Sequence, residues 1–166
     1  MKRTRPTKNK QQKKAMKRIA LFAGTFDPFT RGHQALLMRA LPMFDKIIVA
    51  IGTNAGKQCM QPVEERLKAI EEVFADEEKV EATAYTGLTM DFAREVGATV
   101  LLRGIRSVKD FEYEREIADV NLKIGGIDTV LMMCEPEYAS LSSSIVRELI
   151  SYGKDVTPFL PQQKTK

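Results

Sequence analysis

Strand-like and helix-like segments alternate along most of the chain. The compact apolar run Ile19–Ala23 ends at Gly24, as expected of a strand that is buried on both faces. Further strands are expected at residues 45–52, 79–84, 99–102 and 129–133. Helices are expected at residues 31–43, 62–74, 89–96, 109–124 and 142–150. This alternation predicts right-handed βαβ units, and hence a single Rossmann-like α/β domain whose five-stranded parallel sheet has helices on both faces.

The length and composition of the chain limit the classes of protein to which it can belong. Its 166 residues suffice for one domain with its own hydrophobic core. No stretch approaches the roughly 20 consecutive apolar residues of a membrane helix, and no apolar segment follows the basic N-terminus as in a secretory signal. Cys59 and Cys134 lack metal-type spacing and make a poor disulfide framework. We therefore expect a cytoplasmic protein with free thiols and no membrane partner.

The positive charge of the chain is concentrated in residues 1–15. This segment holds seven Lys or Arg and no acid, and removing these seven from the 26 basic residues leaves 19 against 22 acidic ones. Such a segment could bind nucleic acid, but it lacks aromatic residues on which bases stack. We therefore expect a disordered extension upstream of a second usable start at Met16. The expected domain spans residues 16–161, and residues 162–166 form a C-terminal tail.

Three segments that follow expected strands carry residues suited to phosphate. They are residues 24–33, 54–61 and 103–107. In a parallel α/β sheet, ligands bind outside the carboxyl ends of the strands, near the point where the strand order changes direction. The sequence therefore predicts that these three segments surround one anion-binding site.

The first segment combines a glycine, a hydroxyl and a histidine at a helix start. Gly24 allows a sharp turn, and Thr25 offers a hydroxyl and a backbone donor to a phosphate oxygen. Gly32 and His33 are expected in the first turn of a helix, where unpaired N–H groups and the helix dipole favour anions. His33 is the only histidine of the chain. A lone histidine is more often structural than catalytic, but this position favours a functional role.

The other candidate residues have simpler alternatives. Residues 52–58 superficially resemble a phosphate-binding Walker loop, but their glycines are one residue too close and Gln58 stands where Ser or Thr is needed. Lys57 is then either a phosphate ligand or a solvated lysine. Arg103 and Arg106 flank a glycine after a strand, which favours anion binding. The serines of residues 142–144 could be no more than a helix cap.

Three motifs together resemble one enzyme family. Residues 24–33 have the pattern GTFDP-x-T-x-GH, which resembles the signature of the TxGH branch of the nucleotidyltransferase superfamily. Alone, it would also admit cytidylyltransferases and nicotinamide-nucleotide adenylyltransferases. Residues 103–106, followed by 110–114, are similar to the second signature of bacterial phosphopantetheine adenylyltransferases, and residues 142–147 resemble that family's C-terminal nucleotide-binding serines. The resemblance covers residues 16–161 in the right order and spacing.

The resemblance implies a reaction and its partners. The family transfers the adenylyl group of ATP to 4′-phosphopantetheine by direct in-line displacement, which gives dephospho-coenzyme A and pyrophosphate in coenzyme A synthesis. It further implies Mg²⁺ held mainly by ATP, no metal site made by the protein alone, and a homo-hexamer. A superfamily enzyme with another acceptor, such as nicotinamide mononucleotide, is the nearest rival. A non-catalytic nucleotide sensor and a nucleic-acid-binding protein that uses the basic segment are rivals of another class.

The resemblance also assigns roles to residues of this chain. The implied catalytic residues are His33, which donates to the α-phosphate, and Thr25 and Lys57, which position the attacking phosphate. The implied acceptor contacts are Thr25, Lys57, Thr89 and Arg103. The implied ATP contacts are Thr25, Phe26, His33, Gly104, Arg106, Glu114, Ser142, Ser143 and Ser144.

Some positions leave their role open or depart from the family pattern. Glu114 aligns with an acidic residue near the nucleotide, although a solvated helical carboxylate would fit the sequence nearly as well. Thr89 could equally cap the helix that begins there. Tyr138 stands where many relatives carry Trp in the adenine-side loop, so an aromatic ring is retained. Asn54 occupies a place often held by Ser.

Overall fold

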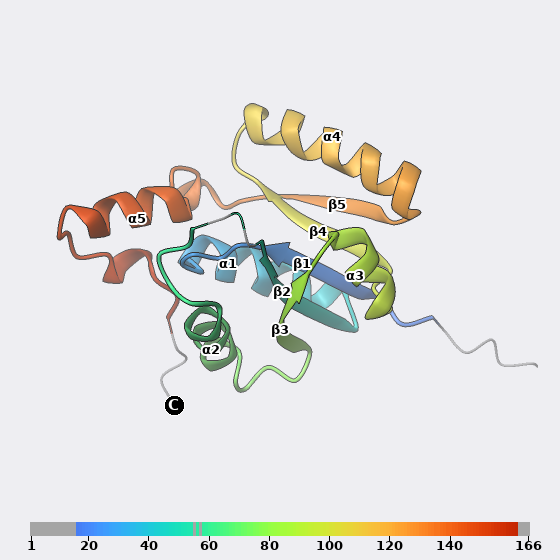
Figure 1. Ribbon diagram of the computed structural model, residues 1–166, viewed down its shortest axis with the longest axis horizontal. Helices are drawn as coiled ribbons and strands as arrows, with labels where there is room; N and C mark the ends of the chain where they lie inside the picture. Colours follow the sequence, from blue (N-terminus) through green and yellow to red (C-terminus); the bar gives the residue numbers. More distant parts are fainter. Residues whose placement is uncertain (1–15, 55, 57, 163–166) are drawn as a thin grey trace, which may run out of the picture.

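The computed structural model describes residues 16–54, 56 and 58–162, and these fold around one parallel sheet (Figure 1). The strands are β1 (Ile19–Gly24), β2 (Lys46–Thr53), β3 (Val80–Thr86), β4 (Val100–Ile105) and β5 (Asp128–Met133). All four neighbouring pairs are parallel, in the order β3-β2-β1-β4-β5. The chain turns back across the sheet between β1 and β4, which makes that position the topological switch point. The predicted five-stranded parallel sheet is confirmed.

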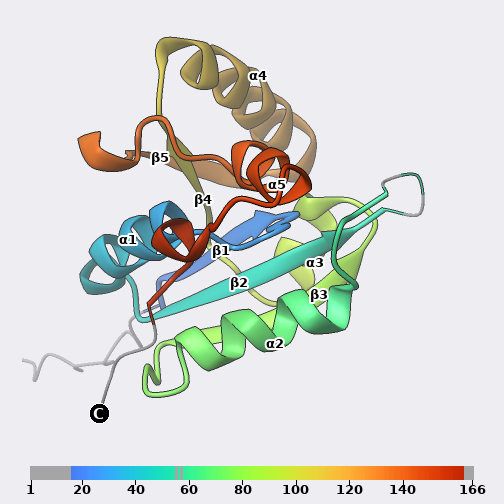
Figure 2. The same ribbon diagram turned by 90° about the vertical axis from the view of Figure 1, so that its left-hand side faces the viewer.

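Helices cover both faces of the sheet (Figure 2). They are α1 (Arg31–Ala40), α2 (Val63–Val73), α3 (Thr89–Glu95), α4 (Val108–Gly125) and α5 (Ser143–Ser151), with 3-10 turns at Leu41–Met43, Pro136–Tyr138 and Thr157–Phe159. Successive residues of β1 enter two separate cores, because side chains of a strand alternate between its faces. Ala20 and Phe22 pack with residues of α1 and α2, whereas Leu21 and Ala23 pack with residues of α3. The prediction of helices on both faces is therefore correct.

Three local predictions differ from the structure. The helix expected over residues 31–43 ends at Ala40 and continues as a 3-10 turn, since Pro42 has no N–H for an α-helical bond. Thr89 is the first residue of α3 and not its cap. β4 continues to Ile105, so the first residues of the expected 103–107 loop belong to the strand.

Gly104 explains why β4 was expected to end early. A Cβ at this position would lie 2.5 Å from Cδ1 of Leu36, so the glycine allows α1 to approach the strand closely. Its role is packing and not chain reversal, and the pairing with β5 continues through Ile105 and Met133. A glycine after an apolar run was thus a misleading sign of a strand end.

The two ends of the chain lie partly outside the described residues. Residues 1–15, with the basic segment, and residues 163–166 belong to that part, so the predictions made for them stay predictions. Gln162 exchanges two hydrogen bonds with Gln34 of α1, at 2.8 and 3.0 Å. Within the described ranges, none of the helices is both long and apolar enough to cross a bilayer.

Candidate active site

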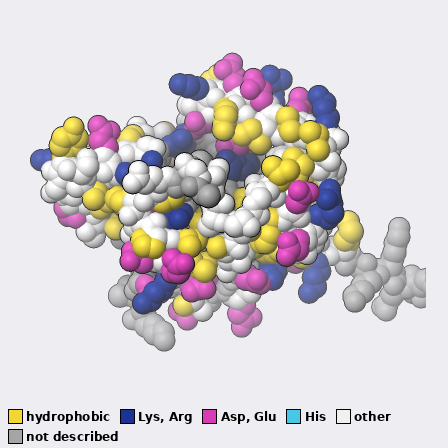
Figure 3. All heavy atoms as spheres, in the orientation of Figure 1, with side chains coloured by type: hydrophobic (Ala, Val, Ile, Leu, Met, Phe, Trp, Pro, Cys, Tyr) yellow, Lys and Arg dark blue, Asp and Glu magenta, His cyan; other side chains and the backbone are white. Residues whose placement is uncertain are grey.

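A pocket of about 510 Å³ opens at the carboxyl ends of β1 and β4, the switch point of the sheet. Figure 3 shows this face hollowed, with dark blue basic side chains in the hollow; the described basic residues that line the pocket are Arg103, Arg106 and Arg147. The pocket is lined by residues from all three predicted segments and from the start of α5. The predicted site residues that line it are Thr25, Phe26, His33, Arg103, Gly104, Arg106, Glu114, Ser142, Ser143 and Ser144.

Two predicted site residues stand apart from this group. The hydroxyl of Thr89 lies 2.7 Å from the hydroxyl of Tyr85, and Thr89 does not line the pocket. Lys57 lies outside the described residues, whereas the two residues that follow it, Gln58 and Cys59, do line the pocket. The role predicted for Lys57 stays a prediction.

The start of α1 determines which nitrogen of His33 carries a proton. Thr30 is the N-cap, and its hydroxyl accepts from the backbone N–H of His33 at 3.4 Å. The backbone N–H of Thr30 donates to Nδ1 of His33 at 3.0 Å, which completes a capping box with histidine in the position usually held by Glu or Gln. Because a backbone N–H can only donate, Nδ1 is the acceptor, and the neutral ring carries its proton on Nε2.

His33 is neutral at physiological pH. Burial of the ring, together with the positive charges of Arg106 and Arg103, lowers the pKa of His33 from its ordinary value to about 4. The rings of Phe26 and Phe29 surround the imidazole, each with its centroid 5.2 Å away. The side chain is therefore arranged to donate one hydrogen bond through Nε2–H, and not to act as a cation or as a proton shuttle near pH 7.

The ring of Phe26 belongs to the core. Its side chain is buried and packs against Phe22 and Phe29 at centroid distances of 5.3 Å. Phe26 has a φ of +47°, and a Cβ on Gly24 would lie 2.8 Å from its ring. The turn thus needs glycine at position 24, since any side chain there would collide with the ring. The contact with ATP predicted for Phe26 consequently rests on its main chain.

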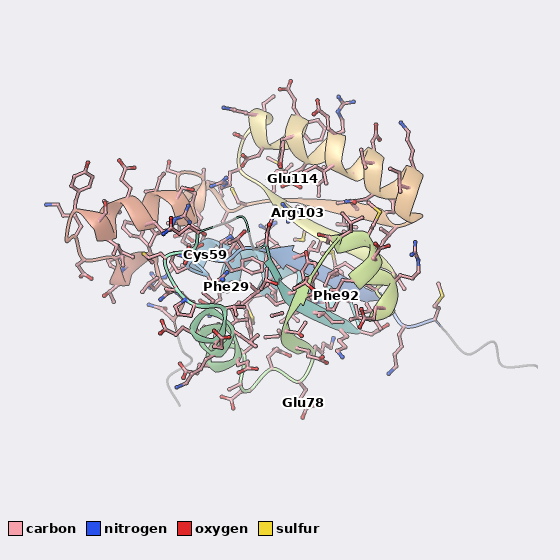
Figure 4. The ribbon with its side chains drawn as sticks, in the orientation of Figure 1. Phe29, Cys59, Glu78, Phe92, Arg103 and Glu114 are labelled. Atoms are coloured by element: carbon pink, nitrogen blue, oxygen red, sulfur yellow. The ribbon has the colours of Figure 1, made fainter. Side chains whose placement is uncertain are left out.

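Arg103 and Glu114 form a paired group at the wall of the pocket (Figure 4). Nε and Nη2 of Arg103 donate to the two carboxylate oxygens of Glu114 at 2.8 and 2.7 Å, and Nη1 donates to the carbonyl of Ala23. Burial lowers the pKa of Arg103, but the hydrogen bond and charge of Glu114 outweigh it and raise the pKa above its usual range. A guanidinium has five N–H bonds, so two are left for a ligand.

The structure excludes one of the two interpretations of Glu114. Glu114 is only 7% exposed, and both of its carboxylate oxygens accept hydrogen bonds from Arg103. The solvated-carboxylate alternative is therefore wrong. Glu114 lines the pocket, yet what it visibly does is orient a cation that faces the same pocket.

Arg106 connects the end of β4 to the segment before α5. Its Nε donates to Asp110 at 3.0 Å, and its Nη1 donates to the carbonyl of Leu141 at 3.1 Å. The side chain retains 37% of its surface, more than that of Arg103. Arg106 thus presents a second, more accessible positive charge on the side of the pocket formed by α5.

The three serines at the start of α5 have separate partners. Ser142 is the N-cap, and its hydroxyl accepts from the N–H of Ile145 at 3.2 Å, which bears out the helix-cap interpretation for this residue. Ser143 donates its hydroxyl to the carbonyl of Pro28 at 2.8 Å. The hydroxyl of Ser144 accepts from Arg147 at 3.2 Å. Because the side chains are engaged within the protein, the first-turn N–H groups of α5 are the groups best placed to bind an anion.

Comparison with known proteins places the chain in a family. A model of the cytidylyltransferase-like family matches residues 21–149. The chain is 53% identical over 145 residues to the phosphopantetheine adenylyltransferase of Phocaeicola vulgatus, covering 87% of this chain and 96% of that protein. The chain belongs to the phosphopantetheine adenylyltransferase family. The protein of that name from Porphyromonas gingivalis is 50% identical over 146 residues, which cover 88% of this chain and 95% of that one.

Solved structures support the same fold for this phosphopantetheine adenylyltransferase family member. A bifunctional NMN adenylyltransferase/ADP ribose pyrophosphatase from Francisella tularensis superposes with a TM-score of 0.66 and 17% identity. The match covers 90% of this chain but 46% of that one. At this identity the likeness concerns the fold alone. The predicted family, a Rossmann-like nucleotidyltransferase fold and the enzyme class are thus confirmed.

The family signature includes an aspartate whose contribution sequence reasoning missed. Asp27 is 3% exposed, and its carboxylate accepts the backbone N–H groups of Met60 and Gln61 at 2.7 and 3.1 Å. Its own carbonyl accepts from Arg147 at 2.6 Å. Asp27 therefore joins the β1–α1 turn to the loop before α2 and to α5. The one signal in the sequence was an acidic residue within the apolar stretch around Phe26 and Phe29.

The carboxylates at this family member's pocket are already occupied. Asp27 binds two backbone N–H groups, and Glu114 binds Arg103. In the part of the chain that the structure describes, no three His, Cys, Asp or Glu side chains could share a metal ion.

Proposed function

We propose that this protein transfers the adenylyl group of ATP to 4′-phosphopantetheine in the cytoplasm, forming dephospho-coenzyme A and pyrophosphate. Family membership at 53% identity over nearly the full length of a relative supports the acceptor. The observation that carries the chemistry is one pocket that brings a neutral histidine donor, two arginines and the N-terminus of α5 together.

The proposed reaction needs positioning and charge stabilisation more than acid–base chemistry. An oxygen of the acceptor phosphate attacks the α-phosphorus of ATP, a new P–O bond forms, and the bond to the bridging oxygen of the β-phosphate breaks. The attacking phosphate is already anionic, so neither a protein nucleophile nor a strong general base is required. The site must hold two polyanions in line and stabilise the charge that builds on the α-phosphoryl oxygens.

The residues divide this task. Nε2–H of His33 donates to an α-phosphoryl oxygen, and Thr25 positions the attacking phosphate together with Lys57. The two remaining N–H bonds of Arg103 bind phosphate from the acceptor side. Arg106 binds the β- and γ-phosphates with the first-turn N–H groups of Ser143 and Ser144.

The other contacts follow from the same arrangement. Thr89 contacts the pantetheine arm beyond the pocket, and the main chain of Phe26 and Gly104 contacts the nucleotide. Glu114 acts on the nucleotide through the arginine that it orients. Mg²⁺ enters with ATP, offsets its charge and is held by the phosphates and water, because the carboxylates that line the pocket are engaged by protein donors.

We further propose that the protein assembles as a homo-hexamer. Apolar side chains of α4 and of the edge strand β5 are exposed on the single chain: Val108, Phe111, Tyr113, Val120, Leu122, Ile124 and Met133. Large exposed apolar patches mark interaction surfaces, and an unpaired edge strand needs cover. Contacts between copies through α4 and β5 would bury these side chains.

Pyrophosphate release tests the proposed acceptor. The purified full-length chain with Mg²⁺ and ATP is assayed with 4′-phosphopantetheine and, in parallel, with nicotinamide mononucleotide. We expect turnover with 4′-phosphopantetheine only, with dephospho-coenzyme A identified by mass spectrometry. No turnover with 4′-phosphopantetheine would reject the proposal, and turnover with the mononucleotide alone would establish the rival function.

A further inference from the structure

Arg66 is a buried cation on the apolar face of α2. It is 5% exposed, and the buried residues of this helix are Arg66 and Ile70 alone. Buried arginines are normally paired with a carboxylate, because an isolated charge is costly to remove from water. Within the described ranges, no acidic side chain forms an ion pair with Arg66. Ordinary core packing does not account for such a residue.

The guanidinium of Arg66 joins two loops that line the pocket. Its Nη1 donates to the carbonyl of Thr25 in the β1–α1 turn at 2.5 Å, and its Nε donates to the carbonyl of Gln61 at 3.0 Å. Thr25 lines the pocket from the first loop, and Gln58 and Cys59 line it from the second. Arg66 itself does not line the pocket, so its contribution passes through these backbone groups.

Both backbone groups of Gln61, at the end of the second loop, form hydrogen bonds with side chains. The N–H of Gln61 donates to Asp27, and the carbonyl of Gln61 accepts from Arg66. The N–H of Met60 donates to the same carboxylate. Asp27 and Arg66 therefore fix the end of this loop against the β1–α1 turn through two independent side chains.

The bond to Thr25 also orients a group that faces a ligand. In a trans peptide the C=O and the following N–H point in opposite directions. Holding the carbonyl of Thr25 toward α2 therefore turns the N–H of Phe26 away from α2. Phe26 lines the pocket, and in the described structure its N–H has no protein acceptor. This N–H is thus available to a phosphate oxygen, with its direction fixed by Arg66.

We propose that Arg66 is a positioning residue of the transfer site: it holds the β1–α1 turn and the β2–α2 loop in the relative placement that phosphate binding requires. The kinetic consequence rests on the proposed function, whereas the effect on loop placement does not. The substitution Arg66→Met removes the donors and the charge while keeping a long side chain.

Kinetics separate positioning from folding. At a temperature well below its melting point, Arg66→Met should lower kcat by about 10²-fold, as expected when a reacting group is misplaced by about 1 Å. The KM for the acceptor should rise, and the KM for ATP should change less, because Arg106 and α5 still hold the triphosphate. Arg39→Met is the matched control: Arg39 also donates to a strand-end carbonyl, that of Met133, at 2.9 Å, and it does not line the pocket. It should keep wild-type kinetics.

Thiol labelling tests loop placement without any acceptor. Cys59 lies in the loop held by Arg66 (Figure 4). Cys134 lines the same pocket directly after β5, a strand that Arg66 does not contact. Alkylation by iodoacetamide, followed by peptide mass spectrometry, should be several-fold faster at Cys59 in Arg66→Met than in the wild type. The rate at Cys134 should be unchanged.

The proposal is overturned if Arg66→Met lowers only the melting temperature and leaves kcat, both KM values and the Cys59 rate unchanged. Equal acceleration at both cysteines would likewise overturn it, as a sign of general loosening. If Arg66→Met does not fold, Arg66→Lys, which keeps the charge but cannot reproduce the forked contact, carries the same comparison with smaller effects expected. A wild-type protein inactive with 4′-phosphopantetheine would reject the proposed function and leave the labelling result decisive for Arg66.

Discussion

At the scale of single residues, the chemistry of the pocket depends on which protons its side chains hold. The N–H of Thr30 occupies Nδ1 of His33, and burial with two nearby arginines keeps the ring neutral. A neutral N–H group can stabilise growing negative charge through a hydrogen bond, without transferring its proton. His33 therefore belongs with the electrostatic groups of the site and not with acid–base catalysts.

Replacing His33 by Ala should reduce kcat by roughly 10²–10³-fold, as for removal of a donor used mainly in the transition state. ATP affinity should change less, since the arginines and α5 still bind the phosphates. Steady-state kinetics and calorimetric titration with ATP measure the two effects separately. Unchanged turnover would refute the role assigned to His33.

His33 also makes stability depend on pH. Its pKa is about 4 in the folded protein and near 6.5 when unfolded, so the unfolded chain binds the extra proton first as the pH falls. The neutral ring therefore contributes to the free energy of unfolding above about pH 6.5. This contribution, of up to about 3 kcal/mol, is lost as the pH falls from 6.5 to 4. His33→Gln keeps an acceptor for Thr30. Urea unfolding at several pH values should show this extra loss in the wild type and not in His33→Gln; parallel curves would contradict it.

Residue patterns predicted the residues that line the pocket better than the residues that hold its loops in place. Thr25, His33, Arg103 and Arg106 were recognisable because each lies close to a glycine at the end of an expected strand or begins an expected helix. Asp27 binds the loop before α2 across 33 and 34 positions, and Arg66 binds Thr25 across 41 positions; no local pattern encodes such contacts. For Arg66, the one available sign was its position on an otherwise apolar helix face.

At the scale of elements, side chains join helices and strands around the pocket. Arg103 on β4 is bound to Glu114 on α4, and Ser143 and Arg147 bind α5 to the β1–α1 turn. The predicted order and type of the main elements were correct because apolar periodicity records them directly. The last residues of β4 depended on a tertiary contact, that of Gly104 with Leu36.

Removing Glu114 tests the link between β4 and α4. Glu114→Ala should lower the free energy of unfolding by about 2–3 kcal/mol, because Arg103 loses the one carboxylate that is bound to it in the described part of the chain. The loss is smaller than for a fully buried pair, since the Arg103 side chain is 32% exposed. Asp91→Ala is the control: its ion pair with Arg94 is exposed and should contribute less than about 1 kcal/mol. Urea unfolding that gives equal losses for both variants would contradict this difference.

At the scale of the whole molecule, a single chain explains the pocket but not the surface beyond it. The pocket residues come from β1, β4, α1, α4 and α5 of one chain, so the described contacts need no second copy. The exposed apolar side chains of α4 lie on the covering layer of the sheet, away from its two cores. The apolar patterns that predicted the fold indicate which side chains are buried within one chain. They do not indicate which exposed face a partner covers.

Light scattering after size exclusion tests whether copies of the chain cover α4. The wild type should elute with six times the mass of one chain, whereas Leu122→Glu combined with Ile124→Glu should give smaller species, because charge cannot be buried in an apolar interface without a partner. Tyr152→Glu is the control, as Tyr152 is 74% exposed and follows α5. A double variant that remains a hexamer would exclude this end of α4 from the interface. A monomeric wild type would reject the assembly, and the proposed chemistry, built from one chain's pocket, would remain open to its own tests.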